Sequence, residues 1–272
     1  MLAKVKKHRA LIAGLGVIIA LAVVLFLPKI SLEKRLLSSA KNFQKNRHWQ
    51  EAAEEYERAV KYAPDSPTGI EAARLGAGVC LYDLKNYEKA VFFFRHLVLH
   101  SQKSTEIKWA QQKLAEVFYE KINNYTQAII EYQRLLQAAP SKEEAADYRL
   151  RLGRSYYYLA NFDQAISEVN EFLNNNPQDP KVFEMMMLKA DSYLALKKID
   201  DAVAIYDQIE KQFASNEELF RVKLNKSLAY EDKKDWDNAV QELEEIKNTY
   251  PHPDVIELKI KSILRRKARK RE

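Results

Sequence analysis

NFDQAISEVNEFLNNNP, residues 161–177, is one of six related stretches that decide the fold of this chain. Each stretch has an alanine, a large apolar residue four positions later and another apolar residue three positions after that; four of them end on a proline. The alanines are Ala52, Ala90, Ala128, Ala165, Ala202 and Ala239, and the steps between them are 38, 38, 37, 37 and 37 residues. So constant a period indicates a repeat array whose units pack mainly against their neighbours.

Composition supports a helical array with charged ends. The 272 residues include only six glycines, and strong helix formers are abundant. Residues 1–9 carry four cations, and residues 265–272 carry six cations and one acid, which leaves a net charge of −3 on the rest. A mildly acidic body argues against a nucleic-acid-binding face. Cys80 is the single cysteine, so no disulfide can form within the chain.

Residues 10–27 form an uncharged run, ALIAGLGVIIALAVVLFL, behind a basic tail and before Pro28. As a helix it would be roughly 27 Å long, close to the thickness of a bilayer core. We predict an uncleaved membrane anchor, because the nearest small-residue cleavage pattern, Ser38-Ser39-Ala40, comes too late for a signal peptide. The four cations of residues 1–9 favour a cytoplasmic N-terminus, with the repeats on the far side, in the periplasm of a bacterium.

The residues before each alanine complete a two-helix pattern. In five units a small residue precedes a large one by three positions: Ala40/Phe43, Gly78/Leu81, Gly153/Tyr156, Ala190/Tyr193 and Ser227/Tyr230. The third unit departs from this, with Glu116 before Tyr119. Over residues 33–251 the sequence resembles the tetratricopeptide repeat family, whose units are helix hairpins. The layout is similar to bacterial envelope members of that family with a single N-terminal membrane anchor.

The resemblance implies an all-α fold: a transmembrane helix, then a right-handed α-solenoid of six helix hairpins and a C-terminal capping helix. The expected parts are a tail at 1–9, a membrane helix at 10–28, repeats within 31–253 and a capping helix with a basic tail at 254–272. The repeats are expected at about 31–64, 67–102, 105–140, 142–177, 180–214 and 216–251. In the capping helix we expect an apolar stripe of Val255, Leu258, Ile260, Ile263 and Leu264.

These units exceed the usual 34 residues by three or four, about one helical turn. We place the extra residues after the proline, because the distance from the aromatic residue to the alanine is normal. Helix-start signals there are Ser66-Pro67, Ser141 with Glu144, and Asp179-Pro180. We therefore expect first helices that are longer by a turn at their N-terminal ends.

Carried over by position, the resemblance implies a protein-binding groove along the first helices. Its residues would be Leu75, Val79, Tyr82, Lys113, Val117, Leu150, Arg154, Tyr157, Met187, Leu194, Leu224 and Leu228. The alternative for each apolar member is packing against the next repeat. The carboxylate clamp of the chaperone-binding subfamily is absent, since Lys41, Val79 and Val117 stand at its positions. Phe92 and Phe93 fall where a second helix meets solvent, so they mark either a second partner surface or local packing.

Signals for chemistry are missing. His96 and His100 lie four residues apart, but no third metal ligand is evident. Tyr156 to Tyr158 and Met185 to Met187 are better explained by packing than by recognition, and we expect Cys80 to be a buried structural thiol. We predict no catalytic residue, no metal and no cofactor.

The sequence favours a membrane-anchored scaffold that binds other proteins or client segments in the cell envelope. The alternative is a permanent structural subunit of a large membrane machine, such as a secretion, pilus or motility complex. Expected partners are proteins or peptides and, through residues 10–27, the bilayer. The basic C-terminal tail could bind anionic lipid or an acidic partner. The sequons at Asn124 and Asn225 leave a eukaryotic secretory lumen open.

Overall fold

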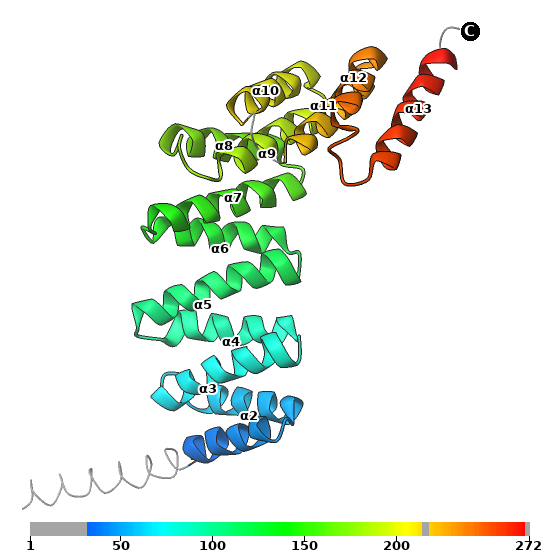
Figure 1. Ribbon diagram of the computed structural model, residues 1–272. Coiled ribbons are helices and arrows are strands. Elements are labelled where there is room, and N and C mark those ends of the chain that lie inside the picture. The colour runs from blue at the N-terminus through cyan, green and yellow to red at the C-terminus, as the bar shows by residue number, and fades with distance from the viewer. Residues whose placement is uncertain (1–31, 214–217, 270–272) are drawn as a thin grey trace, which may run out of the picture. The chain divides into compact units, whose positions relative to one another are not determined.

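The computed structural model describes residues 32–213 and 218–269, and all regular secondary structure in these ranges is helical (Figure 1). The prediction of an all-α fold is therefore confirmed. The chain divides into two compact units, one ending at Ile122 and the other beginning at Asn123. The first unit contains a helix over residues 32–45, α2 (Trp49–Tyr62), α3 (Pro67–Gly78), η1 (Val79–Asp83), α4 (Tyr87–His100), α5 (Ser104–Glu116) and η2 (Val117–Lys121). The second contains α6 (Tyr125–Gln137), α7 (Lys142–Tyr158), α8 (Phe162–Asn175), α9 (Val182–Ala195), α10 (Ile199–Gln212), α11 (Leu219–Lys233), α12 (Trp236–Ile246) and α13 (Pro253–Arg269).

Within each unit, helices that follow one another in the chain pack side by side (Figure 1). The six repeat alanines lie at these contacts with no exposed surface, because a methyl side chain lets neighbouring helices approach closely. The large residues four positions later, Tyr56, Phe94, Tyr132, Val169, Tyr206 and Leu243, are at most 1% exposed. The repeat pattern quoted above is thus the core pattern of the fold.

The two longer steps between repeat alanines each contain a π-helical turn. The backbone N–H of Leu84 donates to the carbonyl oxygen of Val79, five residues earlier, at 3.0 Å, and Ile122 donates to Val117 in the same way at 3.0 Å. A π turn accommodates one residue more than an α turn. One extra residue in each of these units therefore lies at the C-terminal end of the first helix, and not after the proline as predicted.

The position of the hairpin turn supports this placement. Each of the six turns contains a residue with a left-handed backbone, five positions before the repeat alanine: Arg47, Lys85, Asn123, Ala160, Lys197 and Lys234. Because this spacing is constant, the variable residue must precede the turn.

The effect of the extra residue is a shift of register in the first helix. The buried small residue is Ala77 in the second repeat and Ala115 in the third. The interval from each of them to its repeat alanine is one position longer than the interval from Gly153 to Ala165. The departure predicted at Glu116 is thereby explained, since Ala115 takes the small position in that repeat.

The first helices are longer than the second helices in the second, third and fourth repeats. The 12 residues of α3 continue into the 5 of η1, the 13 of α5 continue into the 5 of η2, and α7 has 17 residues, against 14 in α4 and α8. Two predicted helix starts are confirmed. Ser66 caps α3, with Pro67 at the first helical position, and Ser141 and Glu144 form a capping box on α7.

The start predicted at Asp179-Pro180 is wrong. Helix α9 begins later, at Val182, and has 14 residues. Asp179 instead closes a turn before the helix, where its Oδ1 accepts the backbone N–H of Lys181 at 2.8 Å. Proline at position 180 therefore lies in that turn, outside the helix.

Helix α13 covers the last repeat through Ile256, Ile260 and Ile263, which are buried. The predicted stripe is wrong at three of its five positions, because Val255, Leu258 and Leu264 are 50%, 65% and 47% exposed. Residues 1–31, which include the predicted anchor, lie outside the described part of the chain. Among the helices of residues 32–213 and 218–269, none is both long enough and apolar enough to cross a membrane.

Candidate functional site

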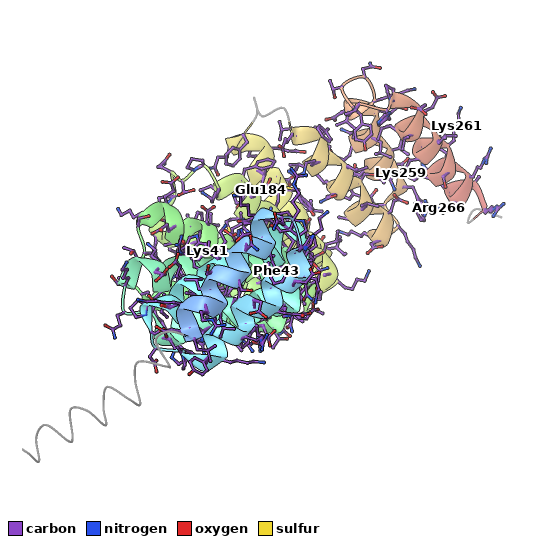
Figure 2. The ribbon with its side chains drawn as sticks, turned by 90° about the horizontal axis from the view of Figure 1, so that it is seen from below. Lys41, Phe43, Glu184, Lys259, Lys261 and Arg266 are labelled. Atoms are coloured by element: carbon purple, nitrogen blue, oxygen red, sulfur yellow. The ribbon has the colours of Figure 1, made fainter. Side chains whose placement is uncertain are left out.

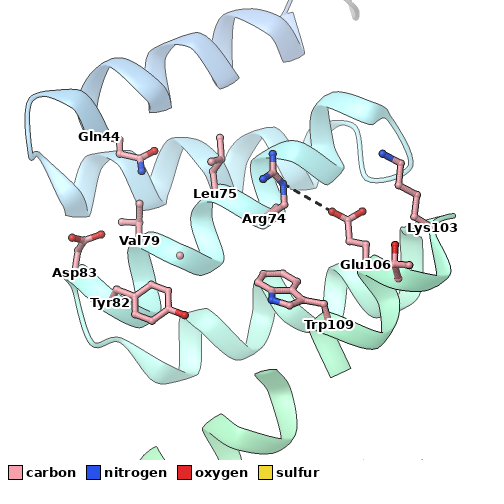
Figure 3. Close-up of a pocket in the computed structure, with 11 residues that line it drawn as sticks. Gln44, Arg74, Leu75, Val79, Tyr82, Asp83, Lys103, Glu106 and Trp109 are labelled. Atoms are coloured by element: carbon pink, nitrogen blue, oxygen red, sulfur yellow. Dashed lines mark ion pairs between the residues drawn. The ribbon is translucent and has the colours of Figure 1, made fainter. Parts of the chain in front are cut away.

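The first unit contains a hollow of about 700 Å³ on the exposed side of α3, between the helix over residues 32–45 and α5 (Figure 3). We call it the Tyr82–Trp109 hollow. Its lining residues are Gln44, Arg74, Leu75, Gly78, Val79, Tyr82, Asp83, Lys103, Thr105, Glu106 and Trp109. The lining comes from three successive first helices, which are the elements that the repeat pattern places side by side.

The middle of the hollow is apolar and aromatic. Leu75, Tyr82 and Trp109 surround it, and Tyr82 is 67% exposed. The Trp109 ring is held edge-on against the buried Phe94 ring, with 5.6 Å between centroids. Gly78 forms part of the wall, and a Cβ added there would meet no atom within 4 Å. The missing side chain at residue 78 therefore helps to keep the hollow open.

The two ends of the hollow carry opposite charges (Figure 3). Asp83 lies at one end beside Gln44, and Lys103 lies at the other beside the Arg74–Glu106 pair, whose charged atoms are 4.0 Å apart. Neither the Asp83 carboxylate nor the Lys103 ammonium forms an ion pair with another residue of the described chain. Both groups are exposed. A bound segment could therefore pair with each of them.

Of the two histidines of α4, His100 lines a smaller hollow of about 410 Å³. His96 Nε2 is 2.9 Å from the carbonyl oxygen of Pro64, His100 Nδ1 is 2.6 Å from Asp65 Oδ1, and the two rings stack at 4.3 Å. Burial lowers the pKa of His96, which favours a neutral ring that donates to Pro64. Within residues 32–213 and 218–269 no three His, Cys, Asp or Glu side chains are grouped to hold a metal.

Cys80 is fully buried in η1. Burial is the main cause that raises the pKa of its thiol, to about 12. A buried thiol with so high a pKa is unreactive at neutral pH, which agrees with the structural role predicted for it.

The predicted groove residues of the first unit fall into two groups. Leu75, Tyr82 and Lys113 reach the surface. Leu75 and Tyr82 line the Tyr82–Trp109 hollow, and Lys113 lines a third hollow, of about 280 Å³, beside η2. Val79 and Val117 are only 1% and 2% exposed, because the π turns direct them inward. Trp109, which the sequence pattern did not select, contributes more to the groove than either valine.

In the second unit, Leu150 and Met187 are buried, so these two residues pack in the core. Met185 and Met186 are buried beside them, as the packing interpretation of the methionine run predicted. Arg154, Tyr157, Leu194 and Leu224 are half-buried, and Leu228 is 40% exposed. No partner is present, so binding by any of these residues stays a prediction.

A polar network crosses the first helices of the second unit. Glu184 on α9 accepts from Arg154 of α7 at 2.6 Å and from Arg221 of α11 at 2.9 Å (Figure 2 labels Glu184). Further along α9, Asp191 Oδ1 accepts from the Tyr206 hydroxyl at 2.6 Å and from Asn225 Nδ2 at 3.0 Å. These contacts fix neighbouring first helices to one another.

The Asp191 carboxyl gives a prediction about pH. Burial, the largest cause, raises its pKa above the ordinary value of 3.8, although the bonds from Tyr206 and Asn225 oppose the rise. A carboxyl with a raised folded-state pKa stabilises the fold when protonated, and this contribution is lost as the pH rises through that pKa. We expect Asp191→Asn, which keeps both accepted bonds, to be at least as stable as the original protein at neutral pH. Its relative advantage should shrink as the pH falls toward the ordinary carboxyl range, as measured by urea unfolding at several pH values. An Asn variant that is less stable by the same amount at every pH would contradict this.

Phe92 and Phe93 do not form one exposed surface. Phe93 is fully buried, and its ring lies against Gly76, where an added Cβ would come within 2.6 Å of a ring atom. Phe92 is half-buried, edge-on to Phe93 and below the ammonium group of Lys61. The packing alternative is therefore correct for Phe93, and only Phe92 remains available as a partner contact.

The basic end of α13 is partly engaged within the second unit. Lys259 and Arg266 both reach Glu231 of α11 at 2.7 Å, and Lys267 pairs with Asp237 of α12 (Figure 2 labels Lys259 and Arg266). Arg265 and Arg269 are exposed and form no ion pair with a described residue. Part of the basic character thus fixes the capping helix in place.

Comparison with known families gives two matching models, both described as tetratricopeptide repeat. One matches residues 37–98 and 150–217, and the other matches residues 109–141 and 222–252. The matched ranges alternate along the chain and together cover most of every predicted repeat. A search of curated protein sequences gives no significant match.

Solved structures with the same fold include MamA, residues 41 to the end, from Desulfovibrio magneticus RS-1. It has 11% identity and a TM-score of 0.52, over 66% of this chain and 94% of that one. YrrB, described as a protein with an unusual peptide-binding site, has 17% identity and a TM-score of 0.50, over 77% of this chain and 99% of YrrB. PilW, described as a widely conserved type IV pilus biogenesis factor, has 14% identity and a TM-score of 0.50, over 86% of this chain and 98% of PilW. At these identities the likeness shows the fold alone.

Proposed function

Because the chain belongs to the tetratricopeptide repeat family, we propose that it is a scaffold that binds a segment of another protein in the Tyr82–Trp109 hollow. The observation that carries the proposal is the hollow itself: about 700 Å³, lined by the exposed Tyr82 and the half-buried Leu75 and Trp109, with a glycine in its wall. Apolar side chains gathered in one hollow often mark a binding site, and tyrosine and tryptophan are enriched among the residues that contribute most to binding. YrrB, which has the same fold, is described as having a peptide-binding site.

We propose that this scaffold catalyses no reaction. Proteins built from these repeats generally act by binding other proteins, and His96, His100 and Cys80 are engaged in packing and hydrogen bonds. Specificity would then come from side-chain contacts along the first helices.

For its location, we propose that residues 10–27 anchor the scaffold in a bacterial inner membrane, with the repeats in the periplasm. The uncharged, apolar character of this run and the four cations before it support the proposal. Protease added to spheroplasts should degrade the repeats. Protection of the repeats until the membrane is lysed would place them in the cytoplasm.

Gly78 offers a direct test of the hollow. We expect Gly78→Leu to occupy part of the hollow beside its apolar lining, and to lower photo-crosslinking to partner protein from a crosslinking residue at position 82 by at least about tenfold. The fold should tolerate the change, because the added side chain enters open space and α3 loses a helix-destabilising glycine. Crosslinked product measured in intact cells gives the readout, and thermal unfolding by circular dichroism monitors the fold.

Gly78→Ala is the matched control. It adds a single methyl group, should stabilise the protein by about 0.5–1 kcal/mol and should leave the crosslinked product unchanged. If Gly78→Leu folds normally and crosslinks as well as the control, the hollow does not bind the partner and the proposal fails.

A second candidate is a permanent subunit of a membrane machine. PilW is described as a pilus biogenesis factor, and Phe92 and the tail residues Arg265 and Arg269 offer further contact points outside the hollow. Purification in mild detergent separates the two ideas. A stoichiometric complex that survives Gly78→Leu supports the subunit role, whereas loss of partner on Gly78→Leu supports the scaffold.

A further inference from the structure

We infer that the segment bound in the Tyr82–Trp109 hollow is an amphipathic helix with acidic residues in its first turn and basic residues in its last. The inference rests on the proposed function. It specifies the direction in which the partner helix lies in the hollow and the charges at its two ends. It is carried by two unpaired, exposed charges at opposite ends of one apolar hollow: Asp83 and Lys103 (Figure 3).

The charges of the hollow are separated along its length. At the Lys103 end, Arg74 and Glu106 lie within 4.0 Å of each other and offset one another, so Lys103 leaves that end positive. At the Tyr82 end the neutral Gln44 is the neighbour, so Asp83 leaves that end negative. Between them stand Leu75, Val79, Tyr82 and Trp109, with no charged group among them. A partner must therefore bring apolar side chains to the middle and opposite charges to its two ends.

The length of the hollow suits a short helix. Residues 74–83 of α3 and η1, which run along its floor, extend roughly 14 Å at an α-helical rise, close to three turns of a partner helix. The hollow is open along one side and offers no strand edge, so a helix lying in a groove is the binding mode that fits. Apolar side chains three or four positions apart on that helix would meet Tyr82 and Trp109 together.

The direction follows from the helix dipole. Helices are stabilised by acidic residues in the first turn and basic residues in the last. A helix of this ordinary kind pairs with Lys103 and Asp83 only if its N-terminus lies at the Lys103 end. Reversed, it would place acid against Asp83 and base against Lys103, and like charges across an interface suppress binding.

The test is a selection of displayed helical peptides on the full chain in detergent, with the Gly78→Leu protein used to remove peptides that bind elsewhere. We expect the retained peptides to share an apolar face, an acidic first turn and a basic last turn. Lys103→Glu and Asp83→Lys should each weaken a retained peptide by about tenfold. A peptide with its end charges exchanged should bind the protein that carries both substitutions better than it binds the original. Lys211→Glu, an exposed change on α10 in the other unit, is the control for net charge.

The outcomes separate this inference from the function on which it rests. Peptides that are lost on Gly78→Leu but are indifferent to Lys103→Glu and Asp83→Lys would keep the hollow as a binding site and overturn the charge pattern. Failure to retain any peptide that distinguishes the original protein from Gly78→Leu would overturn both. If Lys211→Glu weakened peptide binding as much as Lys103→Glu does, the effect would come from the net charge of the protein. That result would also overturn the inference.

Discussion

Deleting Val79 should leave the protein folded, whereas deleting Arg154 should unfold the repeat that contains it. Both deletions remove one residue from a first helix, but only the helix of Val79 contains a π turn. Removing Val79 shortens the step between repeat alanines to the length of the later steps, and gives Ala77 and Ala90 the spacing that Gly153 and Ala165 already have. The buried residues on both sides of the deletion then keep their neighbours. We expect a cost of about 1–2 kcal/mol, mainly from the lost burial of the valine side chain.

Arg154 lies in α7, which is a regular α-helix without a π turn. This helix therefore contains no extra residue that could be deleted without changing the register. Every residue before it would turn by about 100° relative to the rest of the helix. The buried positions of Tyr148, Leu150 and Leu152 would then receive Asp147, Arg149 and Arg151. Burying unpaired charges in place of apolar side chains costs several kcal/mol, and we expect a loss of about 4 kcal/mol or more.

Urea unfolding followed by far-ultraviolet circular dichroism compares the two deletions on the same scale. The Val79 deletion should unfold close to the original protein, and the Arg154 deletion should lose part of its helical signal before urea is added. Equal destabilisation by the two deletions would mean that the π turn does not hold the extra residue. A crystal structure of the Val79 deletion should show a continuous α-helix from Pro67 to the hairpin turn.

This comparison also shows where reasoning from the sequence stopped. The hairpins and their core were predictable, because an alanine and a large residue four positions later lie on the same face of a helix, and the pair recurs at a nearly constant step. The register inside the first helices of the second and third repeats was not predictable in this way. Positions there were counted back from the alanine at the constant pitch of a regular α-helix. That count made Glu116 look anomalous, and it did not predict that Val79 and Val117 are almost fully buried where they line their hollows. The signal was present in the sequence, since the first two steps between repeat alanines are each longer by one than the later three.

Two other differences have local physical causes. In α13, Val255 and Leu258 compete with Ile256, Ile260 and Ile263 for the buried face, and one helix cannot bury both sets. The isoleucines are spaced four and three apart and form the continuous stripe, so they face the core. Trp109 was missed because the site residues were carried over by position from a resemblance, and its position on α5 was not among them. The tryptophan itself, in the first helix of the third repeat, would have been the signal.

The second large effect concerns the ammonium group of Lys226, which is buried between α10 and α12. It lies 2.7 Å from Asp207, 3.1 Å from Glu210 and 2.9 Å from Glu242, and the residue is 7% exposed. Burial lowers the pKa of Lys226, but the hydrogen bonds that its ammonium group donates to Asp207 and Glu242 outweigh this effect, and the net shift of the pKa is upward from 10.5. A lysine with a raised folded-state pKa stabilises the fold at every pH below its ordinary pKa, and the contribution is lost only at higher pH.

We therefore expect Lys226→Met to destabilise the second unit by about 3 kcal/mol at neutral pH, because it leaves carboxylates buried without their cation. Lys223, which reaches Glu210 and Glu242 at 3.4 Å, keeps the loss at the lower end of the usual range. Lys211→Met is the control on α10, exposed and without an ion pair to a described residue. A surface change of this kind should cost at most about 0.5 kcal/mol.

Adding Glu242→Gln to Lys226→Met decides whether the cause is charge or packing. If the cost comes from a stranded carboxylate, the double variant should be more stable than the sum of the two single changes predicts, by about 1 kcal/mol or more. Urea midpoints of the four proteins at neutral pH supply the cycle. Additive losses would mean that the cost does not come from stranding Glu242, because methionine keeps the apolar stem that Lys226 packs between α10 and α12. In that case the carboxylates around it would be solvated well enough to stand alone, and this cluster would not help to fix the last repeats in register.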